Sequence, residues 1–178
     1  MADLNIENIV VSARIASSLN LEVLADTIPN SKYNPGELPV LLLHFSQPKV
    51  AIMVFSSGRV VITGAKTIEE VETSLKILSK QLQQAGIITS KKPIYDIKNI
   101  VASTQFNKTL NLPKIASHLD NVQYEPEHFP GIIHRTTTPS IVIMLFNSGK
   151  IVGNGTNLEE ISIAIDKLSI ELSSQNMI

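Results

Sequence analysis

The sequence predicts an α+β fold made of two copies of one unit, each an antiparallel sheet with helices on one face. The chain repeats itself at a shift of 91 residues. Each copy contains a hairpin of alternating apolar residues, and each ends in a long helix with one apolar stripe. We place the two units at residues 1–90 and 91–178, joined as one continuous pseudo-twofold structure.

The repeat is clear when residues 8–64 are aligned without gaps on residues 99–155. Of the 57 aligned positions, 20 are identical. The matches include "NIVVS" with "NIVAS" and "YNPGELP" with "YEPEHFP". After Gly64 the shift falls to 90, so we expect the second copy to lack one residue just after its hairpin. Self-similarity of this length indicates a duplicated structural unit.

Strand and capping signals predict the first elements of each unit. In the first copy, residues 7–15 ("ENIVVSARI") are expected to form a strand. A short helix is expected after Asn20, because apolar residues then share one helical face until Pro29 ends the run. Further strands are predicted around Tyr33 and over residues 41–45.

The next element is a predicted β-hairpin over residues 49–64, "KVAIMVFSSGRVVITG", with Gly58 at its turn. Both faces of this hairpin are largely apolar, whereas an antiparallel hairpin normally wets one face. A single layer of helices can cover only one of them. The alternation assigns to the covered face Ile52, Val54, Val60 and Ile62, and to the open face Met53, Phe55 and Val61.

A long helix is predicted to close each unit. In the first copy the apolar stripe consists of Ile68, Val71, Leu75, Leu78, Leu82 and Ala85. In the second copy it consists of Leu158, Ile161, Ile165, Leu168 and Leu172. Thr67 with Glu70 predicts a capping box, and Gly86 predicts the C-terminal stop. Asn157 and Glu160 occupy the corresponding start in the second copy.

Composition excludes several classes of function. The chain has 178 residues and no cysteine, so it has neither disulfides nor a thiolate metal site. It has no apolar run of membrane-spanning length and no signal-peptide pattern, so we expect an intracellular protein with no membrane partner. Its four histidines lack metal-ligand spacing, and the open face carries no nucleophile and base. We therefore expect no cofactor and no enzymatic activity.

Two copies side by side would present a broad open apolar surface. Its members are Val10, Met53, Phe55, Val61, Val101, Met144, Phe146 and Val152. Exposed apolar patches of this extent usually mark binding sites. The net charge of −1 is unusual for a nucleic-acid-binding protein, so the residues alone leave open a module that binds a protein or an apolar ligand on this sheet.

The duplicated pattern, above all "YEPEHFPGIIHR" and "FNSGKIV", resembles the TATA-box-binding protein family of archaeal and eukaryotic general transcription factors. The resemblance implies a saddle, in which a curved antiparallel sheet has its helices on the convex face and its concave face in the DNA minor groove. It also implies bending of A·T-rich promoter DNA and recruitment of transcription factor B, and through it RNA polymerase. The absence of a long N-terminal extension favours an archaeal source, with the protein in the cytoplasm and nucleoid; a eukaryotic source would place it in the nucleus.

The resemblance also implies roles for individual residues. Asn8, Asn99 and Thr63 would donate hydrogen bonds to base edges, with Asn154 at the fourth such position. Val10, Val61, Val101 and Val152 would form the groove floor, next to Met53 and Met144. The wedges between base pairs would be Leu38 with Phe55 and Phe129 with Phe146, flanked by Pro39 and Pro130. The phosphate contacts would be Ser57, Arg59, Lys66, Arg135, Ser148 and Lys150, and the transcription factor B contacts would be Glu125 and Glu127.

Some residues depart from the family pattern. Leu38 stands where phenylalanine is usual, and Asn154 stands where threonine is usual. Glu37 and His44 replace common basic residues. The first copy is therefore expected to provide a weaker wedge than the second.

Overall fold

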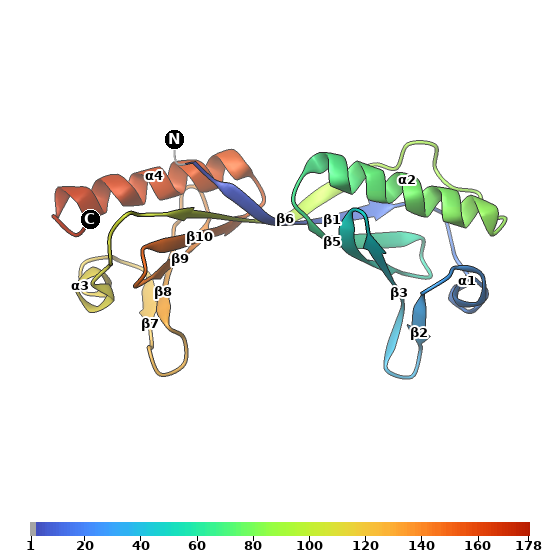
Figure 1. The fold of residues 1–178 in the computed structure, drawn as a ribbon, viewed down its shortest axis with the longest axis horizontal. Helices are drawn as coiled ribbons and strands as arrows, with labels where there is room; N and C mark the ends of the chain where they lie inside the picture. Colours follow the sequence, from blue (N-terminus) through green and yellow to red (C-terminus); the bar gives the residue numbers. More distant parts are fainter. Residues whose placement is uncertain (1–2) are drawn as a thin grey trace. The chain divides into compact units, whose positions relative to one another are not determined.

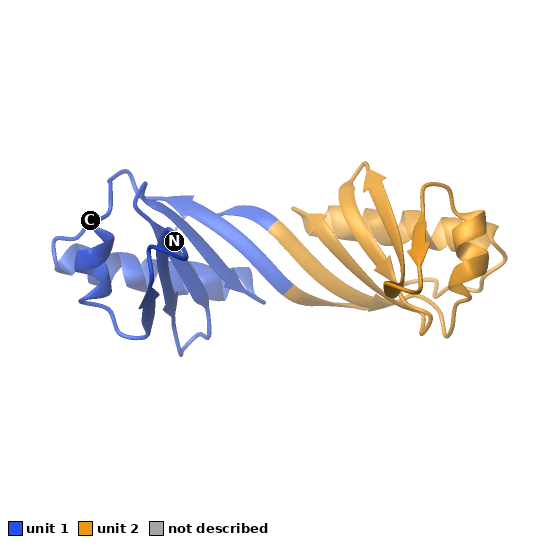
Figure 2. Ribbon diagram, turned by 90° about the horizontal axis from the view of Figure 1, so that it is seen from below, with its two compact units in different colours: residues 1–7, 99–178 blue, residues 8–98 orange. Residues whose placement is uncertain are grey.

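The computed structural model describes residues 3–178, which form ten strands and four helices (Figure 1). The chain divides into two compact units, residues 8–98 and residues 99–178 with the described part of residues 1–7 (Figure 2). The division passes through two strands, β1 (Asn5–Arg14) and β6 (Tyr95–Gln105), each of which contributes residues to both units. The α+β class predicted from the sequence is confirmed.

The unit of residues 8–98 carries the first copy of the repeat. After β1 it contains α1 (Leu21–Thr27), β2 (Lys32–Asn34), β3 (Leu38–Ser46), β4 (Lys49–Val54), β5 (Arg59–Ala65) and α2 (Ile68–Gln84). Its strands are antiparallel and lie in the order β2-β3-β4-β5-β1. Strand β3 begins at Leu38 rather than at the predicted Leu41, because Leu38 already pairs with Asn34 of β2.

The other unit repeats the same sequence of elements. After β6 it contains α3 (Leu112–Ala116), β7 (Val122–Tyr124), β8 (Gly131–Arg135), β9 (Val142–Phe146), β10 (Lys150–Gly155) and α4 (Leu158–Ser174). Its strands lie in the order β6-β10-β9-β8-β7, again antiparallel. The predicted hairpin is β4 with β5 in one unit and β9 with β10 in the other.

The core of each unit lies between its sheet and its long helix. All four side chains assigned to the covered face of the first hairpin are fully buried: Ile52, Val54, Val60 and Ile62. They meet the stripe of α2, of which Val71, Leu75, Leu78 and Leu82 are buried, whereas Ile68 is partly exposed. In each unit the long helix covers one sheet face, and Figure 2 views the other face. Within residues 3–178, none of the helices has the length and apolar character needed to cross a membrane.

The ends of the long helices follow the predicted signals with one difference. The Thr67 hydroxyl accepts a hydrogen bond from the Glu70 backbone N–H at 3.1 Å, but the Glu70 carboxylate accepts from the backbone N–H of Lys66 rather than from that of Thr67. At the other end Gly86 has a φ of +78°, and the Ile87 N–H donates to the carbonyl of Leu82. Gly86 therefore ends α2 in a Schellman motif.

The one-residue difference between the copies lies inside a strand. In the pairing of β1 with β5, Val11 lies opposite Ile62, but Ile9 lies opposite Ala65. Val10 therefore faces two residues of β5, and β5 forms a β-bulge at this point. The β6–β10 register has no such change. The sequence alignment was wrong here: it matched Gly155 with Gly64, but Gly155 pairs with Ile100 as Ala65 pairs with Ile9. The residue absent from the second copy therefore corresponds to Gly64.

Candidate nucleic-acid interface

Each unit presents a sheet face that its long helix does not cover. Strand alternation places on it, in the first copy, Asn8, Val10, Met53, Phe55, Val61 and Thr63. In the second copy it places there Asn99, Val101, Met144, Phe146, Val152 and Asn154. All of these side chains are half-buried, because their neighbours on the sheet shield them even though no helix lies over them. We call these two surfaces the open faces.

The centre of each open face is a row of aliphatic residues. Val61 lies opposite Met53 on one side and Ser12 on the other, and Val152 lies likewise between Met144 and Ser103. The rows continue into Leu42, which pairs with Met53, and Ile133, which pairs with Met144. Sequence reasoning missed Leu42, Ile133, Ser12 and Ser103. The three consecutive leucines 41–43 conceal the alternation that would have identified Leu42.

At the outer end of the second open face two aromatic rings are in contact. The ring centroids of Phe129 and Phe146 lie 5.7 Å apart, and their planes meet at 61°, an edge-to-face arrangement. Gly131 of β8 pairs with Phe146. A Cβ at Gly131 would lie 2.8 Å from the carbonyl oxygen of Leu145, 3.0 Å from Phe129 and 3.3 Å from Phe146, so this crowded position favours glycine.

The corresponding end of the first copy is built differently. Leu38 replaces the first ring and is 47% exposed, while Phe55 is half-buried. The first-copy residue that corresponds to Gly131 is Val40, which is buried. The prolines next to the wedge positions, Pro39 and Pro130, are exposed in their respective copies. The two ends therefore differ in aromatic content and in exposure.

Cationic and hydroxyl side chains lie at the rim of the open faces. Ser57 and Arg59 are exposed in the first hairpin, and Ser148 and Lys150 in the second. Lys66 and Arg135 are also exposed. Within residues 3–178, Arg59, Arg135 and Lys150 take part in no ion pair. Their charges are available to an external anion.

Sequence reasoning missed the residues across the sheet from these cations. Arg14 pairs with Arg59, and its guanidinium donates to the carbonyl oxygen of Ser57 at 3.2 Å. In the second copy, Gln105 pairs with Lys150 and donates to the carbonyl oxygen of Ser148 at 2.6 Å. Only the pairing of β1 with β5 reveals Arg14 as a rim residue, because Arg14 and Arg59 are distant in the sequence.

The polar end of the first open face is organised around Asn8. Its Oδ1 accepts a hydrogen bond from the Gly64 backbone N–H at 2.7 Å, and its Nδ2 donates to Oγ1 of Thr63 at 3.2 Å. The β-bulge thus holds this amide in place. Asn99 and Asn154 take the matching places in the second copy.

The two candidate partner-binding carboxylates lie in the loop between β7 and β8. Glu125 and Glu127 are both exposed. The Glu125 carboxylate accepts a hydrogen bond from Gln123 Nε2 at 3.0 Å and lies 3.5 Å from Nδ1 of His128. Its backbone carbonyl accepts from the N–H groups of His128 and Phe129. Glu125 is therefore fixed in the loop that carries the Phe129 wedge.

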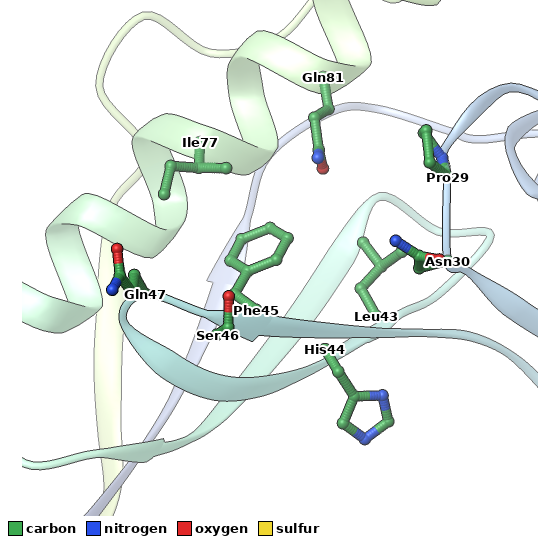
Figure 3. Close-up of a pocket in the computed structure, with 9 residues that line it drawn as sticks. All are labelled: Pro29, Asn30, Leu43, His44, Phe45, Ser46, Gln47, Ile77 and Gln81. Atoms are coloured by element: carbon green, nitrogen blue, oxygen red, sulfur yellow. The ribbon is translucent and has the colours of Figure 1, made fainter.

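One hollow of the structure lies away from the open faces. A cavity of about 250 Å³ is bounded by Leu43 and Phe45 of β3 and by Ile77 and Gln81 of α2, and the ring of His44 points away from it (Figure 3). It lies on the helix side of the first sheet. In the described part of the chain, no three His, Asp or Glu side chains gather as a metal site would require. This cavity is therefore not part of the open faces.

Comparison with known proteins gives a consistent result. The sequence profile of the family described as transcription factor TFIID (or TATA-binding protein, TBP) matches residues 3–85 and again residues 94–174. The TATA-box-binding protein of Pyrococcus horikoshii is 43% identical over 98% of this chain and 92% of its own length. That of Methanococcus vannielii is 39% identical over 96% and 94%. The solved structure of Methanococcus jannaschii TBP superposes with a TM-score of 0.87 at 38% identity, covering 93% of this chain and 95% of that one.

Proposed function

Since the chain belongs to the TATA-binding protein (TBP) family of transcription factors, we propose that it binds A·T-rich promoter DNA in the minor groove, bends it, and recruits transcription factor B and through it RNA polymerase. The observation that carries this proposal is the duplicated open face, in which half-buried aliphatic residues lie between amide or hydroxyl donors at one end and apolar wedges at the other. As a DNA-binding protein, it would act where the cell keeps its DNA.

The aliphatic rows explain a preference for A·T pairs. In the minor groove an A·T pair offers only the acceptors adenine N3 and thymine O2, whereas a G·C pair adds the exocyclic amine of guanine. Against Val61 or Val152 that amine would lose its water and gain no acceptor, at a cost of about 1–3 kcal/mol. The donors at the polar ends, such as Nδ2 of Asn8, match the A·T acceptors.

The wedges explain bending. Apolar side chains inserted between base steps unstack them and kink the duplex, and the bent DNA then contacts more protein surface. The packed pair of Phe129 and Phe146 provides a rigid wedge at the second copy's end of the site. Leu38, being exposed and aliphatic, inserts apolar mass but stacks less well on a base.

The rim cations bind phosphates in spite of the overall charge. Arg14 and Arg59 lie side by side across β1 and β5, while Lys150 provides the cation at the matching rim of the second copy. Local cations on either side of a groove provide affinity through release of counterions, and they do not require a basic protein as a whole. The net charge of −1 reflects carboxylates elsewhere, including the first turns of α2 and α4.

The acidic loop is the proposed contact for transcription factor B. Carboxylates next to DNA repel phosphates, so Glu125 and Glu127 are favourable there only if a basic partner surface meets them. The first copy has Asn34 and Gly36 at the matching positions. Only the second copy therefore offers this pair of charges.

The direct test is a mobility-shift comparison of two duplexes of equal length, one with a central A·T-rich octamer and one with a G·C-rich octamer. Each duplex carries a fluorescent donor and acceptor at its ends, so that bending is read from the same complexes. We expect binding and end-to-end shortening with the A·T-rich duplex only. Equal affinity for the two duplexes, or no binding to either of them, would favour the alternative of a protein- or ligand-binding module.

A further inference from the structure

The two copies hold their central asparagines in different ways. In the first copy the β-bulge places the Gly64 N–H against Asn8, at 2.7 Å from its Oδ1. Gly64 has a φ of +101°, and a Cβ there would lie 3.0 Å from the carbonyl oxygen of Lys49, so the position requires glycine. The second copy lacks this residue and this bulge.

The bulge determines which end of the Asn8 amide faces outward. An N–H group can pair only with the oxygen of an asparagine side chain, so Oδ1 must point toward Gly64. Nδ2 is then the outward donor: one of its protons is directed to Thr63 Oγ1 at 3.2 Å, a hydroxyl that also lies 3.4 Å from Oδ1, and the second proton is retained. Asn8 is thus presented as a hydrogen-bond donor, which suits adenine N3 and thymine O2 and offers nothing to the guanine amine.

The second copy has no such constraint. Asn154 pairs with Val101 in an unbroken register, and in residues 3–178 no hydrogen bond holds the amide of Asn99 or that of Asn154. A free amide can rotate to present either its NH₂ group or its oxygen. Its oxygen can accept a hydrogen bond from the guanine amine and so offset the penalty that the valine floor imposes.

From this difference, and resting on the function proposed above, we infer that Gly64 is a positioning residue that makes the first copy the stricter reader of A·T pairs. The second copy tolerates a G·C pair under its asparagines. An asymmetric site is therefore bound in one orientation, with the first copy on the half that contains only A·T pairs. The protein alone imposes this polarity, before any partner binds.

Orientation is measured by directed cleavage of the DNA. The chain has no cysteine, so Glu37→Cys, in the loop before β3, provides a single attachment point for an iron–EDTA reagent at the first copy's end. The duplex carries a palindromic A·T-rich site in which one pair, next to the centre, is changed to G·C. We expect cleavage to favour the unmodified end about fivefold, the ratio produced when the discrimination is at the lower end of the cost of one wrong base pair. Equal cleavage at both ends, or preference for the G·C end, would overturn the inference.

Two variants assign the effect to the bulge. A glycine inserted between Asn154 and Gly155 restores the missing bulge residue, and we expect the cleavage ratio to fall toward one because both copies then reject G·C. Asn99→Ala with Asn154→Ala is expected to lower the ratio as well, since it removes the amide oxygens that can accept from the guanine amine; this variant decides the matter if the insertion does not fold. A ratio unchanged in the Asn99→Ala, Asn154→Ala protein would contradict the inference. The unmodified palindrome is the control: if it is not bound, the proposed function fails, whereas binding without orientation bias overturns only the polarity.

Discussion

At the scale of single residues, the proposed recognition of DNA by the open faces works mainly by exclusion. Val61 and Val152 are not hydrogen-bonding groups, and their contribution is to make an unpaired guanine amine costly. They lie opposite Met53 and Met144, so each forms part of a continuous aliphatic row. Because these side chains are only half-buried, a change there alters the surface more than the core.

The first prediction concerns this row. Replacing Val61 and Val152 together with glutamate places two carboxylates against the groove floor, so we expect loss of DNA binding by at least about a hundredfold, the equivalent of roughly 3 kcal/mol. Circular dichroism should show that the helices are retained. The matched control adds the same charges at the exposed aliphatic residues Ile88 and Ile170, which lie off the sheet. Undiminished affinity of the Val61→Glu, Val152→Glu protein in a mobility-shift assay would remove the open faces from the interface.

A second residue-scale prediction concerns the rim cations. Each phosphate contact that is lost should reduce the slope of log K against log salt by about 0.9. We expect Arg59→Ala and Lys150→Ala each to lower the slope by about one unit and to weaken binding to all sequences alike. Lys80→Ala, on the helix side of the sheet, is the control and should leave the slope unchanged. A slope that is the same in all three variants would mean that these cations do not meet phosphates.

At the scale of elements, the two copies differ at their wedges. The loop before β8 brings Phe129 into edge contact with Phe146, whereas β3 begins at an exposed leucine, Leu38. A ring held by a neighbouring ring loses less freedom on insertion than an unsupported side chain does. The second copy should therefore contribute more of the bend.

This gives the third prediction. Phe129→Ala should reduce DNA bending more than Leu38→Ala does, as measured by energy transfer between dyes at the two ends of the duplex. Measurements are made at saturating protein, so that a change in affinity does not imitate a change in angle. Equal losses of bending in the two variants would show that the aromatic pair has no special role.

Much of this element-level structure could be predicted from the sequence. The hairpins and the long helices follow from local periodicity, and Gly86 and Thr67 mark helix ends as expected. The features that were missed depend on contacts between strands distant in the sequence. Arg14 becomes a rim residue only because it pairs with Arg59, and Gly155 corresponds to Ala65 only through its pairing with Ile100. Residue identity alone had matched it with Gly64.

The residues of the open faces were predicted only in part, because some of them also depend on pairing between strands that are distant in the sequence. Alternation along one strand indicates which residues share a face, so the valines and methionines of the hairpins were identified. Leu42 was not, because its neighbours are also leucines. The bonding of Asn8 to Gly64 was not predictable either, because it needs a β-bulge that only the strand register reveals.

At the scale of the whole molecule, the duplicated units carry unequal features. One copy has the β-bulge and an exposed leucine wedge; the other has the aromatic pair and the acidic loop. A symmetric protein could not distinguish the two directions along a promoter. In the function proposed above, these differences would set both the orientation of the DNA and the end at which a partner binds.

The fourth prediction tests the partner end. Glu125→Lys with Glu127→Lys should leave binding to DNA alone intact or slightly tighter, since repulsion from phosphate is removed. Recruitment of transcription factor B should weaken, chiefly through a slower association rate. The control, Asn34→Lys with Gly36→Lys, makes the same kind of change in the matching loop of the first copy and should not affect recruitment. If a supershift assay finds recruitment unchanged in the Glu125→Lys, Glu127→Lys protein, the partner binds elsewhere.

The central claim is that the open faces read DNA from the minor groove, and replacing the A·T pairs of a bound site with inosine·cytosine pairs tests it most directly. Inosine lacks the guanine amine, so an inosine·cytosine pair resembles A·T in the minor groove and G·C in the major groove. We predict that affinity and bending on the inosine·cytosine duplex stay within a fewfold of the A·T duplex, while the G·C duplex is not bound. An inosine·cytosine duplex that fails to bind, as the G·C duplex does, would contradict minor-groove recognition.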